Sequence, residues 1–95
     1  ALAVIRCDSE NRQEGMTFLS ELKRSQAVDP DYQMIGPIPA AMARRKNRYR
    51  TQLVVTARGR AKLSAIVTSL VAVAESTRHS HRLKWFVDVD PYESL

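Results

Sequence analysis

Eight basic side chains and no carboxylate fall between residues 32 and 74, although the whole chain carries 10 Asp and Glu against 15 Lys and Arg. The basic residues form two groups, which are Arg44, Arg45, Lys46, Arg48 and Arg50, and then Arg58, Arg60 and Lys62. The net charge of +5 therefore understates how concentrated the positive field is. Such a field favours a polyanionic partner, and nucleic-acid backbones are the commonest polyanions in a cell. The alternative is a solvated basic loop.

The first basic group surrounds one aromatic residue, Tyr49. Basic side chains can hold phosphates, while an aromatic ring can stack on an unpaired base. Tyr49 could equally be a strand residue whose ring packs into the core. No segment resembles a recognition helix for the major groove, so we expect contacts to the backbone and shape of the nucleic acid to dominate over base readout.

The second basic group lies at the predicted start of a helix, where the helix dipole is already positive. Arg58, Arg60 and Lys62 are unfavourable there unless an anion normally occupies this terminus. A phosphate would fit, and so would the C-terminal carboxylate of a peptide. Alternatively, the helix begins two residues later than predicted and the three cations belong to a loop.

No catalytic motif is present, because the sequence lacks a phosphate-binding GxxxxGK[ST] loop, a nucleophile elbow and HExxH. An acylphosphatase would need a glycine-rich phosphate loop after the first strand, where this chain has the acidic segment Cys7–Glu10. Asp88 and Asp90 share one strand face without a third ligand nearby, so we expect a salt bridge at Asp88 rather than a metal site. We predict no cofactor and no catalysis for these 95 residues.

The remaining Cys and His residues give little support for a metal or disulfide site. Cys7 has no partner for a disulfide, which favours a reducing compartment. Together with His79 and His81 it falls short of a four-ligand zinc site, and both histidines are expected in a polar, solvated loop.

Six elements must position these residues. An apolar run over Leu2–Cys7 predicts a buried strand. Asp8 or Ser9 would cap a helix that ends at Asp29-Pro30, and Gly15 would weaken that helix by about 1 kcal/mol relative to Ala. Its core face is predicted from Met16, Phe18, Leu19 and Leu22.

The second half of the chain continues with three more strands and one helix. The segment Gln33–Pro39 is extended but holds two prolines, which restricts it to a sheet edge. A basic hairpin at Ala41–Arg48 leads into an alternating strand, Tyr49–Thr56. A helix is predicted from the apolar spacing of Leu63, Ile66, Val67, Leu70, Val71 and Ala74. Leu83–Val89 alternates as a last strand, with Trp85 facing the core and Asp90-Pro91 forming a turn.

The order β-α-β-β-α-β predicts an α+β, ferredoxin-like fold, which is a four-stranded antiparallel sheet with both helices on one face. A length of 95 residues and 44% hydrophobic content suit one small domain, residues 1–95. No apolar run approaches the ~20 residues of a membrane helix. Because the chain opens on Ala1 without an initiator Met, we expect a domain excised from a larger protein.

Three segments together resemble the C-terminal domain of PriA, the bacterial replication-restart helicase (primosomal protein N′). They are Ile35–Ala40 (IGPIPA), Arg48–Leu53 (RYRTQL) and Lys84–Pro91 (KWFVDVDP). The resemblance runs from Leu2 to Glu93, and its last segment is the most specific part. It implies a ribosomal-protein-S10-like fold, in agreement with the order of elements above.

The resemblance also implies a parent protein, a bacterial cytoplasmic ATP-dependent 3′-to-5′ DNA helicase of the primosome that uses ATP, Mg and Zn outside these residues. In this family the C-terminal domain helps to hold branched or single-stranded DNA against the helicase lobes. It also helps to dock the C-terminal tail of the single-stranded DNA-binding protein. The family's tail-contacting Arg matches Arg60, while Ser64 stands where some members carry an amide side chain.

We therefore expect an accessory DNA-binding domain. Arg44, Arg45, Lys46, Arg48 and Arg50 would hold phosphates, with Tyr49 able to stack. Arg60, assisted by Arg58 or Lys62, would take the acidic tail. One alternative is a module that docks acidic peptides and ignores DNA. The other is a standalone ribosomal-protein-S10-like protein, which would prefer RNA through 2′-hydroxyl contacts.

Overall fold

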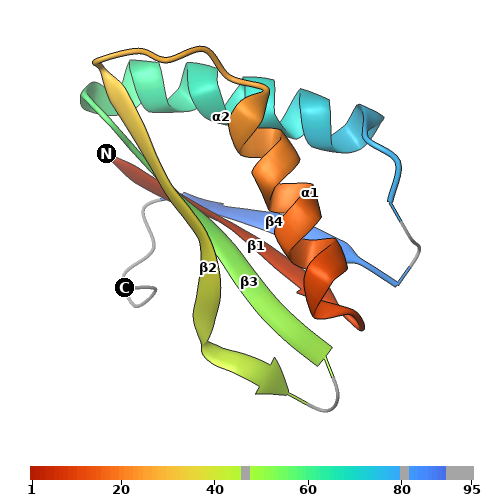
Figure 1. Ribbon diagram of the computed structural model, residues 1–95. Helices are drawn as coiled ribbons and strands as arrows, with labels where there is room; N and C mark the ends of the chain where they lie inside the picture. The colour runs from red at the N-terminus through yellow and green to blue at the C-terminus, as the bar shows by residue number, and fades with distance from the viewer. Residues whose placement is uncertain (46–47, 80–81, 90–95) are drawn as a thin grey trace.

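The computed structural model describes residues 1–45, 48–79 and 82–89, with the side chains of residues 41–45 left out of the description. Within these ranges the chain forms four strands and two helices, and the predicted order β-α-β-β-α-β is confirmed (Figure 1). The elements are β1 (Leu2–Ser9), α1 (Arg12–Arg24), β2 (Tyr32–Arg45), β3 (Arg48–Ala57), α2 (Gly59–Ser76) and β4 (Lys84–Val89).

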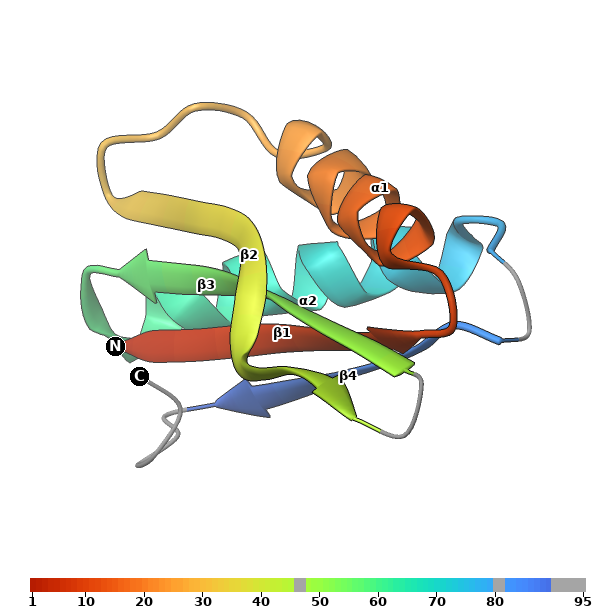
Figure 2. The ribbon, with the colours of Figure 1, turned by 60° about the horizontal axis from the view of Figure 1, so that its bottom comes forward.

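The strands form one antiparallel sheet in the order β2-β3-β1-β4, and both helices cover the same face of it (Figure 2). Ile5 on β1, for example, lies opposite Leu53 on β3 and Val87 on β4. β1 and β3 are central, and β2 and β4 are the edges. The ferredoxin-like fold predicted from the sequence is therefore confirmed, including the edge position that Pro37 and Pro39 required.

The core lies between the sheet and the two helices, as the alternation of apolar residues predicted. Buried side chains from β1, β3 and both helices make up most of it, and they include Ile5, Leu19, Leu22, Leu53, Val55, Leu63 and Leu70. Trp85 packs against this cluster from β4, with its ring centroid 6.4 Å from that of Phe18. The predicted inward orientation of Trp85 is thus confirmed.

The predicted N-cap of the first helix was wrong. Asp8 and Ser9 belong to β1, where they lie opposite Arg50 and Tyr49 of β3. Asn11 caps the helix instead, and its side-chain oxygen accepts hydrogen bonds from the backbone N–H groups of the second and third helical residues, at 2.8 and 3.3 Å. Strand pairing therefore extended β1 at the expense of the helix start.

The first helix also ends earlier than predicted, at Arg24 rather than just before Asp29. Ser25 closes the last turn, because its backbone N–H contacts the carbonyls of Glu21 and Leu22 and its hydroxyl donates to the Leu22 carbonyl at 2.6 Å. These bonds satisfy carbonyls that a longer helix would otherwise have used. The segment up to Asp29 is consequently a loop.

Gly15 lies buried on α1 where the helix approaches the sheet most closely. A Cβ at this position would lie 3.0 Å from the Ser9 hydroxyl, 3.0 Å from the Thr51 hydroxyl and 3.4 Å from the Cys7 sulfur. Glycine at position 15 therefore lowers the helix propensity but allows the helix to pack closely against the sheet.

β2 is much longer than the predicted strand and bends midway along its length (Figure 2). Its pairing with β3 is irregular between Ile35 and Ile38 and again between Pro39 and Arg44. Gly36 sits at the first irregularity with a φ of 116°, a conformation that favours glycine. The bend lets β2 continue beyond the prolines into the basic hairpin.

α2 begins at Gly59 and runs to Ser76, so the boundary predicted from the sequence holds. Leu63, Leu70 and Ala74 form its buried face. Neither helix in the described ranges has the length and apolar character needed to cross a membrane.

The sheet face opposite the helices, which we call the open face, is not covered by any element of the described residues (Figure 2). Val4 and Val54 lie side by side at its centre and are almost fully buried. Ile35 and Ile38 on β2 and Phe86 on β4 are exposed at its two edges. Residues on both faces of β3 are thus buried, although the alternation of apolar and polar residues predicted one buried face.

Candidate functional site

The first basic group occupies the tip and base of the β2–β3 hairpin. The backbones of Arg44 and Arg45 lie opposite Tyr49 and Arg48, so β2 and β3 are paired at this end of the hairpin. Lys46 and the side chains of Arg44 and Arg45 lie outside the described residues. The strand pairing nevertheless brings the basic residues of both strands onto one hairpin, as the sequence predicted.

Arg48 is held by other protein groups at the base of the hairpin. Its guanidinium donates to the Asp8 carboxylate at 2.5 Å, to the Asp8 carbonyl at 3.2 Å and to the Arg82 carbonyl at 2.7 Å. The carboxylate of Glu10 lies 3.7 Å away. Arg48 therefore ties β3 to the end of β1 and to the segment that precedes β4, which leaves little of its charge for a ligand.

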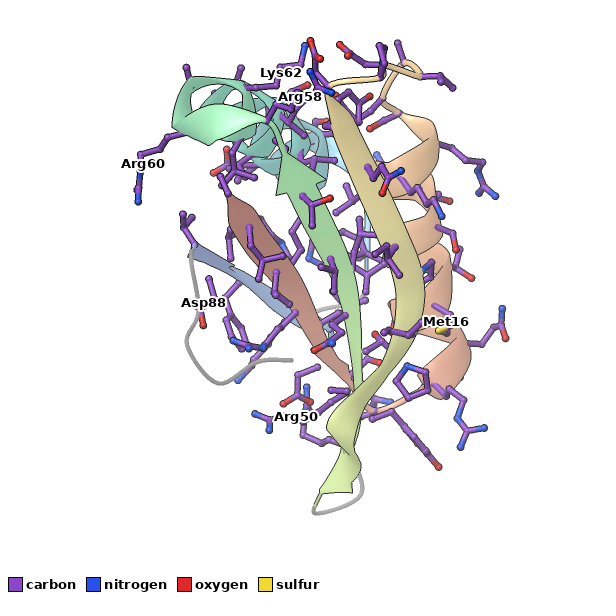
Figure 3. The ribbon with its side chains drawn as sticks, turned by 90° about the vertical axis from the view of Figure 1, so that its left-hand side faces the viewer. Met16, Arg50, Arg58, Arg60, Lys62 and Asp88 are labelled. Atoms are coloured by element: carbon purple, nitrogen blue, oxygen red, sulfur yellow. The ribbon has the colours of Figure 1, made fainter. Side chains whose placement is uncertain are left out.

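Arg50 differs from Arg48, although it lies only two residues farther along the same strand. It lies opposite Asp8 on the open face, and Figure 3 shows its side chain at the end of the sheet nearest the hairpin. Asp8 is taken by Arg48, and no ion pair of Arg50 is found among the described residues. Arg50 is therefore the described hairpin cation best placed to hold a phosphate.

Tyr49 points to the helix side of the sheet, because it alternates with Arg48 and Arg50. The Arg12 guanidinium lies 5.3 Å from the centre of its ring, and the residue is half-buried. Such cation–π contacts are favourable by about 0.5–1 kcal/mol at exposed sites. The Tyr49 ring therefore already has a partner in Arg12, with which a stacking base would have to compete.

The side chains of the second basic group, Arg58, Arg60 and Lys62, point in two different directions. Arg58 is the N-cap of α2 but makes no side-chain capping bond, and the first turn contains no acidic residue. Figure 3 shows Arg58 and Lys62 near the start of β2, whereas Arg60 projects on the side of β4. Residues two apart on a helix point about 200° apart, so the three cations cannot face one ligand.

Lys62 is engaged by the loop between α1 and β2. Its ammonium donates to the Asp29 carboxylate at 2.6 Å and lies 5.9 Å from the centre of the Tyr32 ring. This hydrogen bond lowers the pKa of Asp29 below its ordinary value and raises the pKa of Lys62. Lys62 therefore secures the α1–β2 loop and is poorly placed to assist Arg60.

A groove of about 270 Å³ lies beside Arg60, between α2 and the end of β4. Arg60 and Ser64 line it together with apolar and hydroxyl side chains, which are Leu63, Val67, Thr68 and Val89. The sequence predicted Arg60 and Ser64 as neighbours one helical turn apart. The contribution of Val89 was missed, because only the tertiary packing brings the end of β4 to the start of α2.

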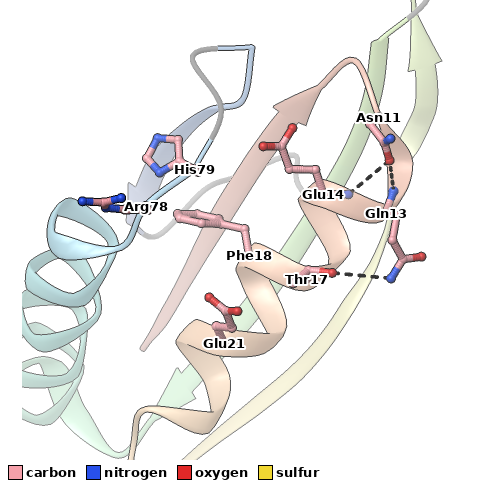
Figure 4. Close-up of a pocket in the computed structure, with 8 residues that line it drawn as sticks. All are labelled: Asn11, Gln13, Glu14, Thr17, Phe18, Glu21, Arg78 and His79. Atoms are coloured by element: carbon pink, nitrogen blue, oxygen red, sulfur yellow. Dashed lines mark hydrogen bonds between the residues drawn. The ribbon is translucent and has the colours of Figure 1, made fainter.

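A second groove, of about 350 Å³, lies between α1 and the segment after α2 (Figure 4). Phe18 forms its floor, and the ring of His79 meets Phe18 edge-on at 5.2 Å. Glu14 and Glu21 on α1 line one side, and Arg78 lines the other. His79 is exposed, as predicted, but it is also packed on Phe18 rather than simply solvated.

The acidic residues form ion pairs rather than a metal site in the described ranges. Asp88 accepts from Arg6 at 2.8 Å, which confirms the predicted salt bridge. Among the described residues, no group of three His, Cys, Asp or Glu side chains could hold a metal ion. Asp90, Pro91 and His81 lie outside the described residues. The buried Cys7 is unreactive in character, since burial raises the pKa of its thiol to about 12.

The chain matches the family model of the primosomal protein N C-terminal domain over residues 1–92. The match spans nearly all of the chain and includes each of the three segments whose motifs resemble PriA. The resemblance found in the sequence is thereby confirmed.

Proposed function

Since this chain belongs to the family of primosomal protein N C-terminal domains, we propose that it is the DNA-binding accessory domain of a replication-restart helicase. Membership of the family implies a role in the primosome. The observation that carries the DNA-binding proposal is the basic hairpin, whose residues 44–50 include five Lys and Arg and no Asp or Glu. Arg44, Arg45, Lys46 and Arg50 bind DNA phosphates in this proposal, and Arg48 holds the base of the hairpin in shape.

The groove beside Arg60 supports a second part of the proposal, the docking of the C-terminal tail of single-stranded DNA-binding protein. A guanidinium binds a carboxylate with paired hydrogen bonds, and the apolar walls from Leu63, Val67 and Val89 can receive hydrophobic side chains of the tail. Ser64 offers a hydroxyl in place of a longer amide side chain. Arg58 and Lys62 take no direct part, because they point away from this groove.

The rest of the proposed assembly follows from the family. The parent protein would be a bacterial cytoplasmic helicase whose lobes bind ATP and Mg and whose separate insertion binds Zn. The domain would work against those helicase lobes and beside other primosome proteins, without catalysing a reaction itself.

The DNA-binding part is tested by fluorescence anisotropy with a labelled forked DNA at increasing salt. The logarithm of the affinity should fall with the logarithm of salt concentration by about 0.7 for each single-strand phosphate contact. Replacing Lys46 and Arg50 together with Ala should reduce that slope by about one to two. A control variant with Arg24→Ala and Arg78→Ala removes the same charge from the helix side and should leave the slope nearly unchanged. Equal losses in the two variants would contradict a specific role for the hairpin.

The tail-docking part is tested with a labelled peptide that carries the last ten residues of the single-stranded DNA-binding protein. Arg60→Ala should weaken binding at least tenfold, whereas Arg58→Ala, at the same helix start, should not. Amidation of the peptide's C-terminus should reproduce the effect of Arg60→Ala. If the peptide binds but forked DNA does not, the domain is an acidic-peptide docking module instead.

A further inference from the structure

Phe86 is a large aromatic side chain exposed on the open face of the sheet. Its neighbour Trp85 packs against the core, while 44% of the surface of Phe86 remains accessible on the opposite side. A single exposed apolar residue needs no special explanation. The charges around Phe86, however, are arranged in a way that points to a ligand.

The carboxylates of the open face are already neutralised by arginines. Asp88 accepts from Arg6 at 2.8 Å, and Asp8 accepts from Arg48 at 2.5 Å. These two pairs leave the face with no carboxylate that lacks a cationic partner among the described residues of β1, β3 and β4. An anion that approaches Phe86 therefore meets little repulsion.

Two cations beside Phe86 have no such internal partner. Lys84 and Arg50 both lie opposite Asp8, one on each side of β1, and neither forms an ion pair within the described ranges. Lys84 precedes Phe86 by two residues on β4, so the two side chains share the open face about 6.6 Å apart along the strand. Arg50 lies two strands from Lys84, about 10 Å across the sheet. An aromatic ring and two cations at these separations match the base and the phosphates of a short single strand.

The polar residues next to Phe86 argue against an apolar protein partner. Phe86 lies opposite Arg6, and Arg6 lies opposite Gln52, so two polar residues separate Phe86 from the β2 edge of the face. The centre of a protein–protein interface is normally apolar and depleted of charge. The exposed Ile35 and Ile38 lie on β2, at the far edge from Phe86.

The geometry points to the open face as a second nucleic-acid site, at which an unpaired DNA base stacks on Phe86 while Lys84 and Arg50 hold the adjacent phosphates. This inference rests on the proposed DNA binding and extends it, because the hairpin needs only the backbone, whereas this site needs an unpaired base. Bases in a duplex are stacked on each other and cannot reach the ring. The site therefore gives the domain a preference for single strands that a basic hairpin alone would not supply.

The test compares two variants at Phe86 in the whole chain. Phe86→Leu keeps an apolar side chain but removes the aromatic face, whereas Phe86→Tyr keeps it. Phe86→Leu should weaken binding to a short oligothymidine by about five- to a hundredfold, as expected for one lost base–aromatic stack. Phe86→Tyr should bind as tightly as the native chain. Ile35→Ala is the matched control, since Ile35 lies on the same face with a similar exposure of 51%.

Two further measurements separate stacking from a change in folding or in charge. An oligonucleotide with abasic sites keeps every phosphate, so it should bind the native chain as weakly as oligothymidine binds Phe86→Leu. Photocrosslinking of an oligonucleotide that carries iodouracil should attach the base to Phe86, as located by mass spectrometry of the digested chain.

The outcomes distinguish this inference from the proposed function. If forked DNA still binds through the hairpin while Phe86→Leu and the abasic strand lose nothing, the open-face site is refuted and the proposed function stands. If the native chain binds neither forked nor single-stranded DNA, both are refuted. A crosslink at Tyr49 instead of Phe86 would move the stacking site to the hairpin and overturn the inference.

Discussion

Replacing Arg48 with Ala should destabilise the fold far more than it weakens DNA binding, although the sequence groups Arg48 with the DNA-binding cations. The guanidinium bonds one carboxylate and two carbonyls, and both Arg48 and its partner Asp8 are only 27% exposed in their side chains. An ion pair of this exposure contributes about 1 kcal/mol, and each partly screened bond to a carbonyl adds about 0.5–1 kcal/mol. The expected loss in the free energy of unfolding is therefore about 2–3 kcal/mol.

The loss is measured by urea and thermal unfolding of the native chain and the variant. A loss of about 2 kcal/mol corresponds to a drop in Tm of roughly 8–16 °C for a domain of this size. The variant should remain folded, because domains of this length are stable by about 5 kcal/mol or more. Arg48→Lys should recover less than half of the loss, since one ammonium cannot reproduce the fork of bonds to β1 and to the segment before β4.

Arg50→Ala is the matched control, because it removes the same charge two residues away on the same strand face. It should change the free energy of unfolding by no more than about 0.5 kcal/mol, while it lowers the salt dependence of DNA binding by about 0.7 in slope. A structural role for Arg48 is refuted if Arg48→Ala leaves stability unchanged but weakens DNA binding as much as Arg50→Ala does. That result would mean that Arg48 leaves Asp8 when DNA is bound.

Three further outcomes are expected. Gly15→Ala should lower the free energy of unfolding, measured in urea, by up to about 2 kcal/mol. The cost of overpacking against Ser9 and Thr51 exceeds the ~1 kcal/mol gained in helix propensity. Unchanged stability would show that the helix can shift. Burial raises the pKa of the Cys7 thiol and so favours its neutral form in the folded chain. The native chain should therefore keep its full stability advantage over Cys7→Ala below pH 9.0 and lose up to about 1.4 kcal/mol of it per pH unit as the pH rises towards 12. A difference that stays constant with pH would contradict this. Because the pKa of Asp29 is lowered, its pairing with Lys62 stabilises the native chain above pH 3.8 and is lost on acidification. The difference in the free energy of unfolding between the native chain and Asp29→Asn should therefore vanish in acid. A stability advantage of the native chain that persists at low pH would exclude the ion pair as its source.

The fold could be predicted from the sequence because each element carries its own local signal. The period of two in β3 and β4, the helical spacing around Leu63 and Leu70, and the prolines that restrict β2 to an edge all agree with one topology. The boundaries of α1 could not be predicted in the same way. Asp8 and Ser9 are good N-caps locally, but Asp8 pairs with strands on both sides and Ser9 pairs with β3. Asn11, two residues after Ser9, caps the helix instead.

The positive charge of the candidate site could be predicted from the sequence, but the ion pairs that its basic residues form could not. Arg48 and Asp8 are forty residues apart in the sequence, and only the register of β1 with β3 reveals that they neutralise each other. Lys62 and Asp29 form a similar pair across a loop whose course no local pattern predicts. The opposite directions of Arg60 and Lys62, by contrast, follow from helix geometry alone, so their spacing in the sequence is enough to exclude a shared ligand.

The same pairing explains why the remaining cations lie where they do. Arg6, Arg48 and Lys62 each lie near a carboxylate on a neighbouring strand or loop, and each forms an ion pair with it. Arg50 keeps its charge at the hairpin end of the sheet, and Arg60 projects beside β4 from a helix start that contains no acidic residue (Figure 3). A cation near a helix N-terminus is unfavourable in the isolated helix, and an anionic ligand at this position would offset that cost. Arg50, for which no ion pair is found among the described residues, is then a cation that remains for binding on the side of the sheet that the helices leave open.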